Sequence, residues 1–206
     1  NLLLDNLLLV DIYNRAKKLH IAVGVRRVVF LVESHETVEG TVQEALKEFF
    51  SSEAGDFVTA VDEKNSIVVK ELSPEDTYTE VQKIADSMLD MLSSEVMLST
   101  RVSYGTIVNE IKEVSRSYKE AKMALEVGKI FFVDRRIVAY NALGIGRLIY
   151  QLPIPLCKMF IKEIFADVSP DDFDEETLET IAKFFENNLN VSETSRQLFI
   201  HRNTLV

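Results

Sequence analysis

Four hydrogen-bonding side chains lie next to one another close to the end of the sequence. Residues 201–204 are His-Arg-Asn-Thr, and apolar residues lie on both sides of them. Arg pairs with guanine and Asn with adenine in the DNA major groove, and all four side chains can donate hydrogen bonds to phosphate oxygens. We therefore expect these residues to form the first turn of a helix that contacts DNA.

The residues before this cluster predict the first helix of a helix-turn-helix motif. A Ser hydroxyl accepts hydrogen bonds from free backbone N–H groups, so Ser192 is placed to cap a helix over residues 193–199. Ser195 provides the small residue that a close helix crossing needs, and Phe199 stands where many such motifs have Gly, which weakens the match. The alternative interpretation is a pair of helices that closes the fold, with its polar residues solvated.

A DNA-binding role has to be reconciled with an acidic protein. The 206 residues carry a formal net charge of -10, which disfavours broad electrostatic attraction to nucleic acid. Contact with DNA would therefore come from a small local patch. The residues that we expect in this patch are Ser192, Arg196, His201, Arg202, Asn203, Thr204 and Val206.

A second group of candidate side chains lies in two separate places along the chain. Glu33 and His35 follow an apolar run, and Asp62 and Glu63 lie in a polar turn, so this set could in principle hold a metal ion. A solvated loop and a strand end explain these residues equally well. The sequence contains no Ser/His/Asp triad, no phosphate-binding loop and no Cys/His zinc spacing, and we expect no catalytic residue, metal ion or cofactor.

Composition is that of an ordinary globular protein, and we expect a cytoplasmic location. Apolar residues make up 47% and charged residues 27% of the chain, a mixture that supports a buried core. Cys157 is the single cysteine, so no internal disulfide can form, and its amphipathic surroundings predict a thiol packed in the core. The leucine-rich start has neither the basic lead nor the cleavage site of a signal peptide, and no apolar stretch is long enough to span a bilayer.

Hydrophobic periodicity predicts the elements of the first part of the chain. A helix is expected over about residues 2–19, its leucine face either pairing between subunits or packing on its own sheet. The β-branched run 28–32 predicts a strand buried on both faces, and residues 41–50 predict a helix with Phe49 on its apolar side. Two β-prone runs around a polar loop predict a hairpin over residues 57–69.

The second part begins with a predicted helix start and ends in helices alone. Ser73 as N-cap and Pro74 at the first helical position predict the next helix, and a strand is expected over about residues 97–104. A further amphipathic helix and a strand follow, and beyond Gly146 the pattern is helical only, with an acidic break at residues 169–176. The apolar face of the helix after this break is predicted to consist of Leu178, Ile181, Ala182, Phe185 and Leu189. Strands that alternate with helices around one hairpin predict an α/β (α+β) sandwich, in which helices cover a mixed sheet.

Several segments resemble the PucR/CdaR family of bacterial transcription regulators. Residues 188–206, NLNVSETSRQLFIHRNTLV, are similar to the C-terminal helix-turn-helix of that family, and the element HRNTL is quite specific. Residues 103–149 resemble the second half of the family's GGDEF-like domain, notably at YNALG, and the strand RRVVFLV resembles its beginning. The resemblance covers nearly the whole chain.

The resemblance implies two domains without catalytic activity. A degenerate GGDEF-like domain is expected over residues 1–150, and a helical region over residues 151–206 contains the helix-turn-helix from about residue 174. Diguanylate cyclases share this fold and carry two glycines on a hairpin, where the backbone approaches the nucleotide. The hairpin here is VDEKNS and contains no glycine, so we do not expect cyclase activity.

The resemblance also implies partners for the whole protein. It implies a homodimer that binds DNA and responds to a small metabolite, such as a sugar diacid or a purine catabolite, through an upstream sensory domain. In the family, HRNTL is followed by more helix, so residues 1–206 are expected to form only part of the recognition helix and to bind DNA weakly. The alternative is a ligand-sensing or dimerisation module that does not bind DNA.

Overall fold

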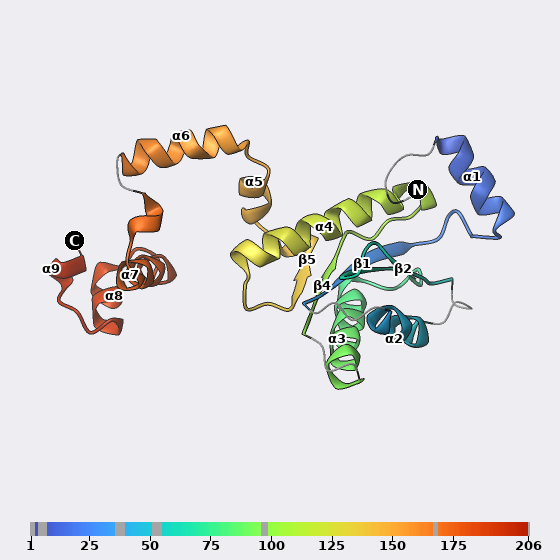
Figure 1. Ribbon diagram of the computed structural model, residues 1–206, viewed down its shortest axis with the longest axis horizontal. Coiled ribbons are helices and arrows are strands. Elements are labelled where there is room, and N and C mark those ends of the chain that lie inside the picture. The colour runs from blue at the N-terminus through green and yellow to red at the C-terminus, as the bar shows by residue number, and fades with distance from the viewer. Residues whose placement is uncertain are drawn as a thin grey trace. The chain divides into compact units, whose positions relative to one another are not determined.

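The computed structural model divides the chain into two compact units (Figure 1). The first comprises Asn1–Gln151 and the second Leu152–Val206. The residues that the structure describes are 3, 8–35, 40–50, 55–95, 99–166 and 169–205.

The first unit is built on a mixed sheet of five strands in the order β2-β3-β1-β4-β5. Neighbouring strands are antiparallel except for β4 and β5, which run parallel. Helices cover both faces, so the predicted α/β sandwich with a mixed sheet is confirmed. The strands are β1 (Arg27–Ser34), β2 (Phe57–Ala60), β3 (Asn65–Glu71), β4 (Thr100–Tyr104) and β5 (Ile137–Ala139). The helices of this unit are α1 (Leu9–Lys18), α2 (Thr41–Phe49), α3 (Tyr78–Glu95), η2 (Ile111–Glu113), α4 (Val114–Phe131), η3 (Tyr140–Ala142) and α5 (Gly146–Tyr150).

The central strand β1 is buried on both faces, as its apolar run predicted. All residues from Val28 to Val32 are at most 3% exposed. Successive side chains of a strand point to opposite faces, so Phe30 joins the core beneath α2 and α3, and Leu31 joins the core beneath α4. Figure 1 shows α4 on one side of the sheet and α2 and α3 on the other. Each such side chain contributes about 1.5–3 kcal/mol on burial, so β1 anchors both layers.

Helix α4 lies close to the sheet because a glycine leaves room for its backbone. A Cβ added to Gly105 would lie 2.0 Å from the carbonyl oxygen of Ser117. The Ser117 hydroxyl donates to the Thr106 carbonyl at 2.8 Å and accepts from the Val29 N–H at 3.1 Å. These bonds fix the height of α4 over β1.

The first helix begins later than predicted. Leu8 has an extended backbone, so a continuous helix over residues 2–19 is wrong, and α1 starts at Leu9. Of the preceding residues, the structure describes Leu3 and Leu8 alone. Ile12 and Ala16 of α1 pack against Ile111, which places this helix on its own domain.

Local hydrogen bonds move the start of α3 away from the predicted position. The helix begins at Tyr78 rather than after Ser73, because Thr77 forms a stronger cap. The Thr79 N–H donates to Thr77 Oγ1 at 3.3 Å, and Glu80 accepts from the Thr77 N–H at 3.0 Å, the reciprocal pattern of a capping box. Ser73 and Pro74 form a turn instead.

Other predicted elements are confirmed with changes at their ends. The hairpin forms between β2 and β3, but Asn65 already belongs to β3 and shortens the loop. Strand β4 begins at Thr100, and residues 97 and 98 of the predicted strand lie outside the described residues. At the end of α2 the expected burial of Phe49 is wrong, since Phe49 is 41% exposed and Phe50 enters the core at 6%.

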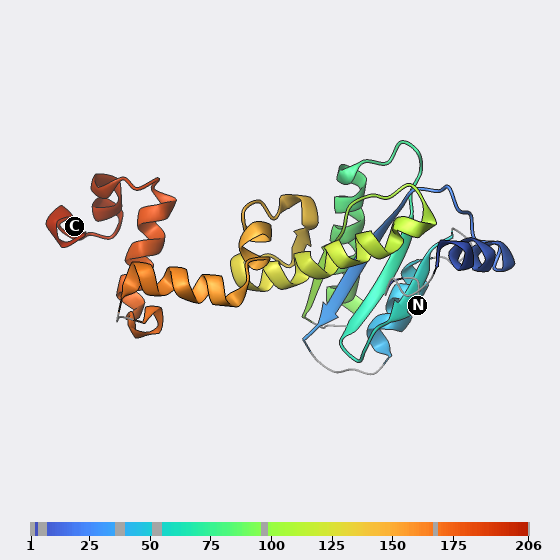
Figure 2. The same cartoon turned by 90° about the horizontal axis from the view of Figure 1, so that it is seen from above.

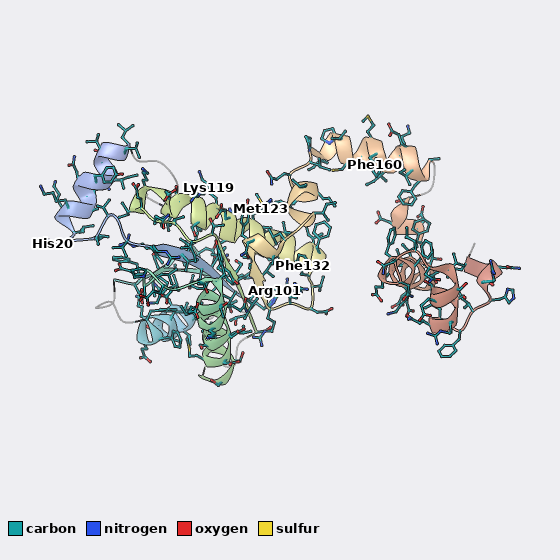
Figure 3. All side chains as sticks on the ribbon, turned by 180° about the vertical axis from the view of Figure 1, so that it is seen from behind. His20, Arg101, Lys119, Met123, Phe132 and Phe160 are labelled. Atoms are coloured by element: carbon teal, nitrogen blue, oxygen red, sulfur yellow. The ribbon has the colours of Figure 1, made fainter. Side chains whose placement is uncertain are left out.

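The second unit contains only helices among its described residues (Figure 2), as predicted from Gly146 onward. Helix α6 has no buried residue, and Phe160 on this helix, labelled in Figure 3, is 61% exposed. Cys157 of the same helix is partly exposed, so the prediction of a core thiol is wrong. The elements are α6 (Ile154–Phe165), η4 (Pro170–Asp172), α7 (Glu175–Glu186), α8 (Val191–Gln197) and α9 (Arg202–Leu205).

Candidate nucleic-acid interface

Helix α7 starts from a well-formed cap. The Asp174 carboxylate accepts a hydrogen bond from the Thr177 N–H at 2.7 Å. Hydrogen bonds from the Thr177 side chain and backbone hold the pKa of Asp174 below its usual range. The negative charge also lies at the positive end of the helix dipole, which further favours a helix start at this point.

The apolar face predicted for α7 lies largely in solvent within the described part of this unit. Leu178 is 49% and Phe185 67% exposed. Leu189 was expected on the same face but lies beyond the helix, in a turn where its φ is 63°. The reason is that Asn188 and Leu189 both adopt left-handed conformations, which end the helical periodicity.

Helix α8 is capped by Asn190 rather than by Ser192. The Asn190 side chain accepts a hydrogen bond from the Glu193 N–H at 3.1 Å, and the helix runs from Val191 to Gln197. The prediction that Ser192 is the cap and that the helix reaches Phe199 is therefore wrong. Asn is as good a cap as Ser. Ser192 consequently lies in the first turn of α8, exposed to solvent.

Two small side chains of α8 form the buried side of the motif. Thr194 is fully buried, and Ser195 is 8% exposed, which agrees with the small residue expected there. Asn187, just after α7, donates from Nδ2 to Thr194 Oγ1 and to Gln197 Oε1, both at 3.2 Å. This side-chain bridge holds α8 against the end of α7.

The turn after α8 has the geometry of a Schellman motif. The Ile200 N–H donates to the Ser195 carbonyl at 3.0 Å, and the Phe199 N–H donates to the Arg196 carbonyl at 3.3 Å. Phe199 has a φ of 55°, the left-handed region in which Gly is favoured, and its side chain is 96% exposed. Phe199 therefore takes the place of the usual Gly, and the turn keeps the same backbone conformation.

The donor-rich residues lie at the start of the short helix α9. The His201 carbonyl accepts from the Thr204 N–H at 2.8 Å, and His201 Nδ1 accepts from the Asn203 N–H at 3.3 Å, so His201 caps the helix. All residues from 201 to 204 are exposed, and Leu205 is partly buried. Val206, also expected in the interface, lies outside the described residues.

The expected contact residues on α8 differ in their availability. Ser192 and Arg196 are four positions apart, so they lie on one side of this helix. The Arg196 guanidinium forms an ion pair with Glu193 at 2.6 Å, and its hydrogen bond lowers the pKa of Glu193. Arg202 forms no ion pair within the described part of the chain. Arg202 is therefore the cation of the motif with the fewest competing interactions.

The hairpin of the first unit is arranged as a turn. The Asp62 carboxylate accepts from the Lys64 N–H at 2.9 Å and the Asn65 N–H at 2.8 Å, and these bonds, led by that of Lys64, lower the pKa of Asp62. Glu33 lies opposite Asn65 in the pairing of β1 with β3, beside the hairpin, but its carboxylate is paired with Lys129 at 2.6 Å. Within the described ranges, no group of three or more His, Cys, Asp or Glu side chains is placed to hold a metal ion.

Sequence reasoning missed the residues that hold the motif together. Asn187 bridges two helices, and its role has no local signature, because its partners lie seven and ten residues away. Asn190 does have a signature, since an Asn followed three residues later by Glu193 is the pattern of a helix start.

Two helices joined by a tight turn, with exposed donors on the second helix, define a protein with a helix-turn-helix. The sequence pattern of the PucR C-terminal helix-turn-helix domain matches residues 177–206, and that of the GGDEF-like domain matches residues 6–127. The chain belongs to the PucR/CdaR family of transcription regulators. No helix in the described part of the chain is long and apolar enough to cross a membrane.

Two curated relatives carry regulator names. The chain is 24% identical over 148 residues to the purine catabolism regulatory protein of Bacillus subtilis (strain 168), covering 69% of this chain and 28% of the relative. It is 28% identical over 124 residues to the carbohydrate diacid regulator of Escherichia coli (strain K12), covering 60% and 32% respectively. The chain thus matches about a third or less of the length of either relative.

A solved structure, a regulator of polyketide synthase expression from Bifidobacterium adolescentis, is also similar. Its TM-score is 0.49 at 13% identity, and the alignment covers 98% of this chain and 81% of that one.

Proposed function

We propose that the second unit binds DNA through α9 and the exposed side of α8, as part of a transcription regulator. The observation that carries this proposal is the run of exposed donors from His201 to Thr204 at the start of a helix that follows a tight turn. In helix-turn-helix proteins, the first residues of the second helix contact base edges. Ser192 and Arg196 of α8 would contact phosphates, Arg196 after exchanging Glu193 for a phosphate oxygen.

We further propose that the two parts of the chain have different roles. Residues 1–150 form a GGDEF-like domain without cyclase activity, and residues 151–206 form the helical region with the motif from about residue 174. The matched family ranges and the boundary between the two compact units support this division. The hairpin favours the absence of catalysis, because Asp62 is committed to its own turn.

The regulator would act in the cytoplasm as a homodimer, since paired half-sites raise both affinity and specificity. Its effector would be a small metabolite, such as a sugar diacid or a purine catabolite, sensed outside residues 1–206. The names of the two relatives support this class of effector.

The test is DNA binding by variants of α9 in the longest native form of the protein. A duplex is first selected from random sequences, and binding is then measured by fluorescence anisotropy. Arg202→Ala and Asn203→Ala should each weaken binding by about 1–3 kcal/mol, the range for a bidentate base contact. Arg116→Ala is the matched control and should bind normally, because Arg116 is an exposed residue of α4 that is paired with Glu113. Full binding by both α9 variants would remove these residues from the interface.

A further inference from the structure

An apolar cavity of about 410 Å³ lies in the first unit between α1 and the sheet. Ile12 of α1 and Leu19, directly after this helix, form one wall, and Phe57 and Val69 of the sheet form the opposite one. Helix α4 packs mainly on β1 and β4, so this part of the sheet face remains accessible, and Phe57 is 43% exposed. Sites for small molecules have volumes of about 300–1,000 Å³ and mostly apolar walls. The cavity therefore has the size and lining of a small-molecule site.

The charge of this cavity is opposite to that of the protein. The chain carries a formal net charge of -10, yet the ionisable side chains among the lining residues are two arginines, Arg15 and Arg27. Arg27 is 2% exposed and already satisfied, because it donates to the Ala22 carbonyl at 2.7 Å and pairs with Glu71 at 3.1 Å. The lining thus selects against cations and favours an anion.

Arg15 differs from Arg27 in being available. It lies on the cavity side of α1 and is exposed, and its guanidinium forms no hydrogen bond or ion pair within the described residues. A guanidinium binds a carboxylate through two parallel hydrogen bonds, which gives both affinity and orientation. A free Arg beside an apolar cavity is therefore complementary to a molecule with an apolar body and one anionic end.

We propose that this cavity binds a small amphiphilic carboxylate, such as an acyl or aryl carboxylic acid of moderate size. The apolar body lies against Ile12, Phe57 and Val69, and the carboxylate pairs with Arg15. The bound molecule connects α1 to β2, since it contacts both elements. The site is independent of the DNA interface, and it survives if the proposed DNA contacts fail.

The test uses a fluorescent reporter in the wall of the cavity. The chain contains no Trp, so Phe57→Trp introduces a single indole at the site. This variant is titrated with octanoate and, in parallel, with octanamide, which has the same chain without the charge. A saturable change in indole emission is expected, with octanoate binding about tenfold more tightly than octanamide.

Three further variants show whether the cavity and Arg15 are responsible. Arg15→Gln should remove the preference for octanoate. Lys18 is a neighbouring cation of α1 that does not line the cavity, so Lys18→Gln should retain this preference. Thr59→Tyr fills the cavity from an exposed strand position and should abolish the saturable change for both molecules. Equal binding of octanoate and octanamide, or no saturable change in emission in the millimolar range, would overturn the proposal. Equal losses of octanoate affinity in Arg15→Gln and Lys18→Gln would also overturn it, as would binding that persists in Thr59→Tyr.

Discussion

Phe199 offers the most direct test of the turn that precedes α9. Its φ of 55° belongs to the left-handed region, and the side chain makes little contact because it is 96% exposed. We predict that Phe199→Gly stabilises the turn. The substitution removes the backbone strain and exposes almost no surface that was buried.

The size of the effect follows from two opposing terms. A left-handed conformation costs an L-residue about 1–2 kcal/mol, which Gly does not experience. Gly is also more flexible in the unfolded chain, which offsets about 0.5–1 kcal/mol of that gain. The net stabilisation should be about 0.5–1 kcal/mol. Phe199→Ala is the matched control, because it removes the same side chain but keeps the strain, and it should change stability very little.

Native-state hydrogen exchange measures this difference locally. The Ile200 N–H donates to the Ser195 carbonyl at 3.0 Å and is released only when the turn opens. Its exchange should slow by about two- to fivefold in the Gly variant and stay near the native rate in the Ala variant. Equal exchange in both variants, or faster exchange with Gly, would refute the assignment of strain to this position.

Three further predictions concern caps, packing and pH. Asn190→Ala should destabilise α8 by about 1 kcal/mol, whereas Ser192→Ala should have little effect, both followed by amide exchange in that helix. Gly105→Ala should destabilise the first unit by more than about 3 kcal/mol in denaturant unfolding, because the added methyl would overlap a carbonyl of α4, while Gly24→Ala has open space and should be tolerated. The lowered pKa of Asp174 means that its contribution to α7 is present at neutral pH and is lost as the pH falls through the folded-state pKa, which lies below the usual range of Asp. In Asp174→Asn, which keeps the acceptor but does not titrate, NMR should show no such loss of the first turn of α7.

The sequence predicted elements best where one strong pattern had no local competitor. The run Val28–Val32 could be placed because a strand buried on both faces needs continuous apolar residues, and the structure confirms it. Caps were predicted less well, because several residues nearby offer similar hydrogen bonds. Thr77 prevailed over Ser73, and Asn190 over Ser192, through bonds whose geometry depends on the path of the chain.

The residue types in the sequence identify the candidate interface, but they do not identify the contacts that support it. Residues 201–204 are singled out because their side chains can bind base edges, and in the structure all four are exposed at the start of α9. The bridge from Asn187 to Thr194 joins separate helices, so no periodicity signals it. The exposure of the apolar face of α7 could not be predicted either, because amphipathic spacing identifies an apolar side without identifying what it contacts.

The acidity of the chain determines how the proposed interface would work. Most non-specific affinity for DNA comes from cations that displace counterions along the phosphate backbone. Arg196 is already paired with Glu193. A DNA phosphate would replace the Glu193 carboxylate as its partner, so Arg196 adds less binding free energy than an unpaired cation would. Arg202 remains available, and its neighbours on α9 are neutral donors suited to base edges and phosphates alike. An interface of this kind gains more from sequence-specific hydrogen bonds than from charge, which leaves weak binding to a single half-site. A second copy on the adjacent half-site would then supply the missing affinity, so the salt dependence of binding should be shallow while the dependence on half-site spacing is steep.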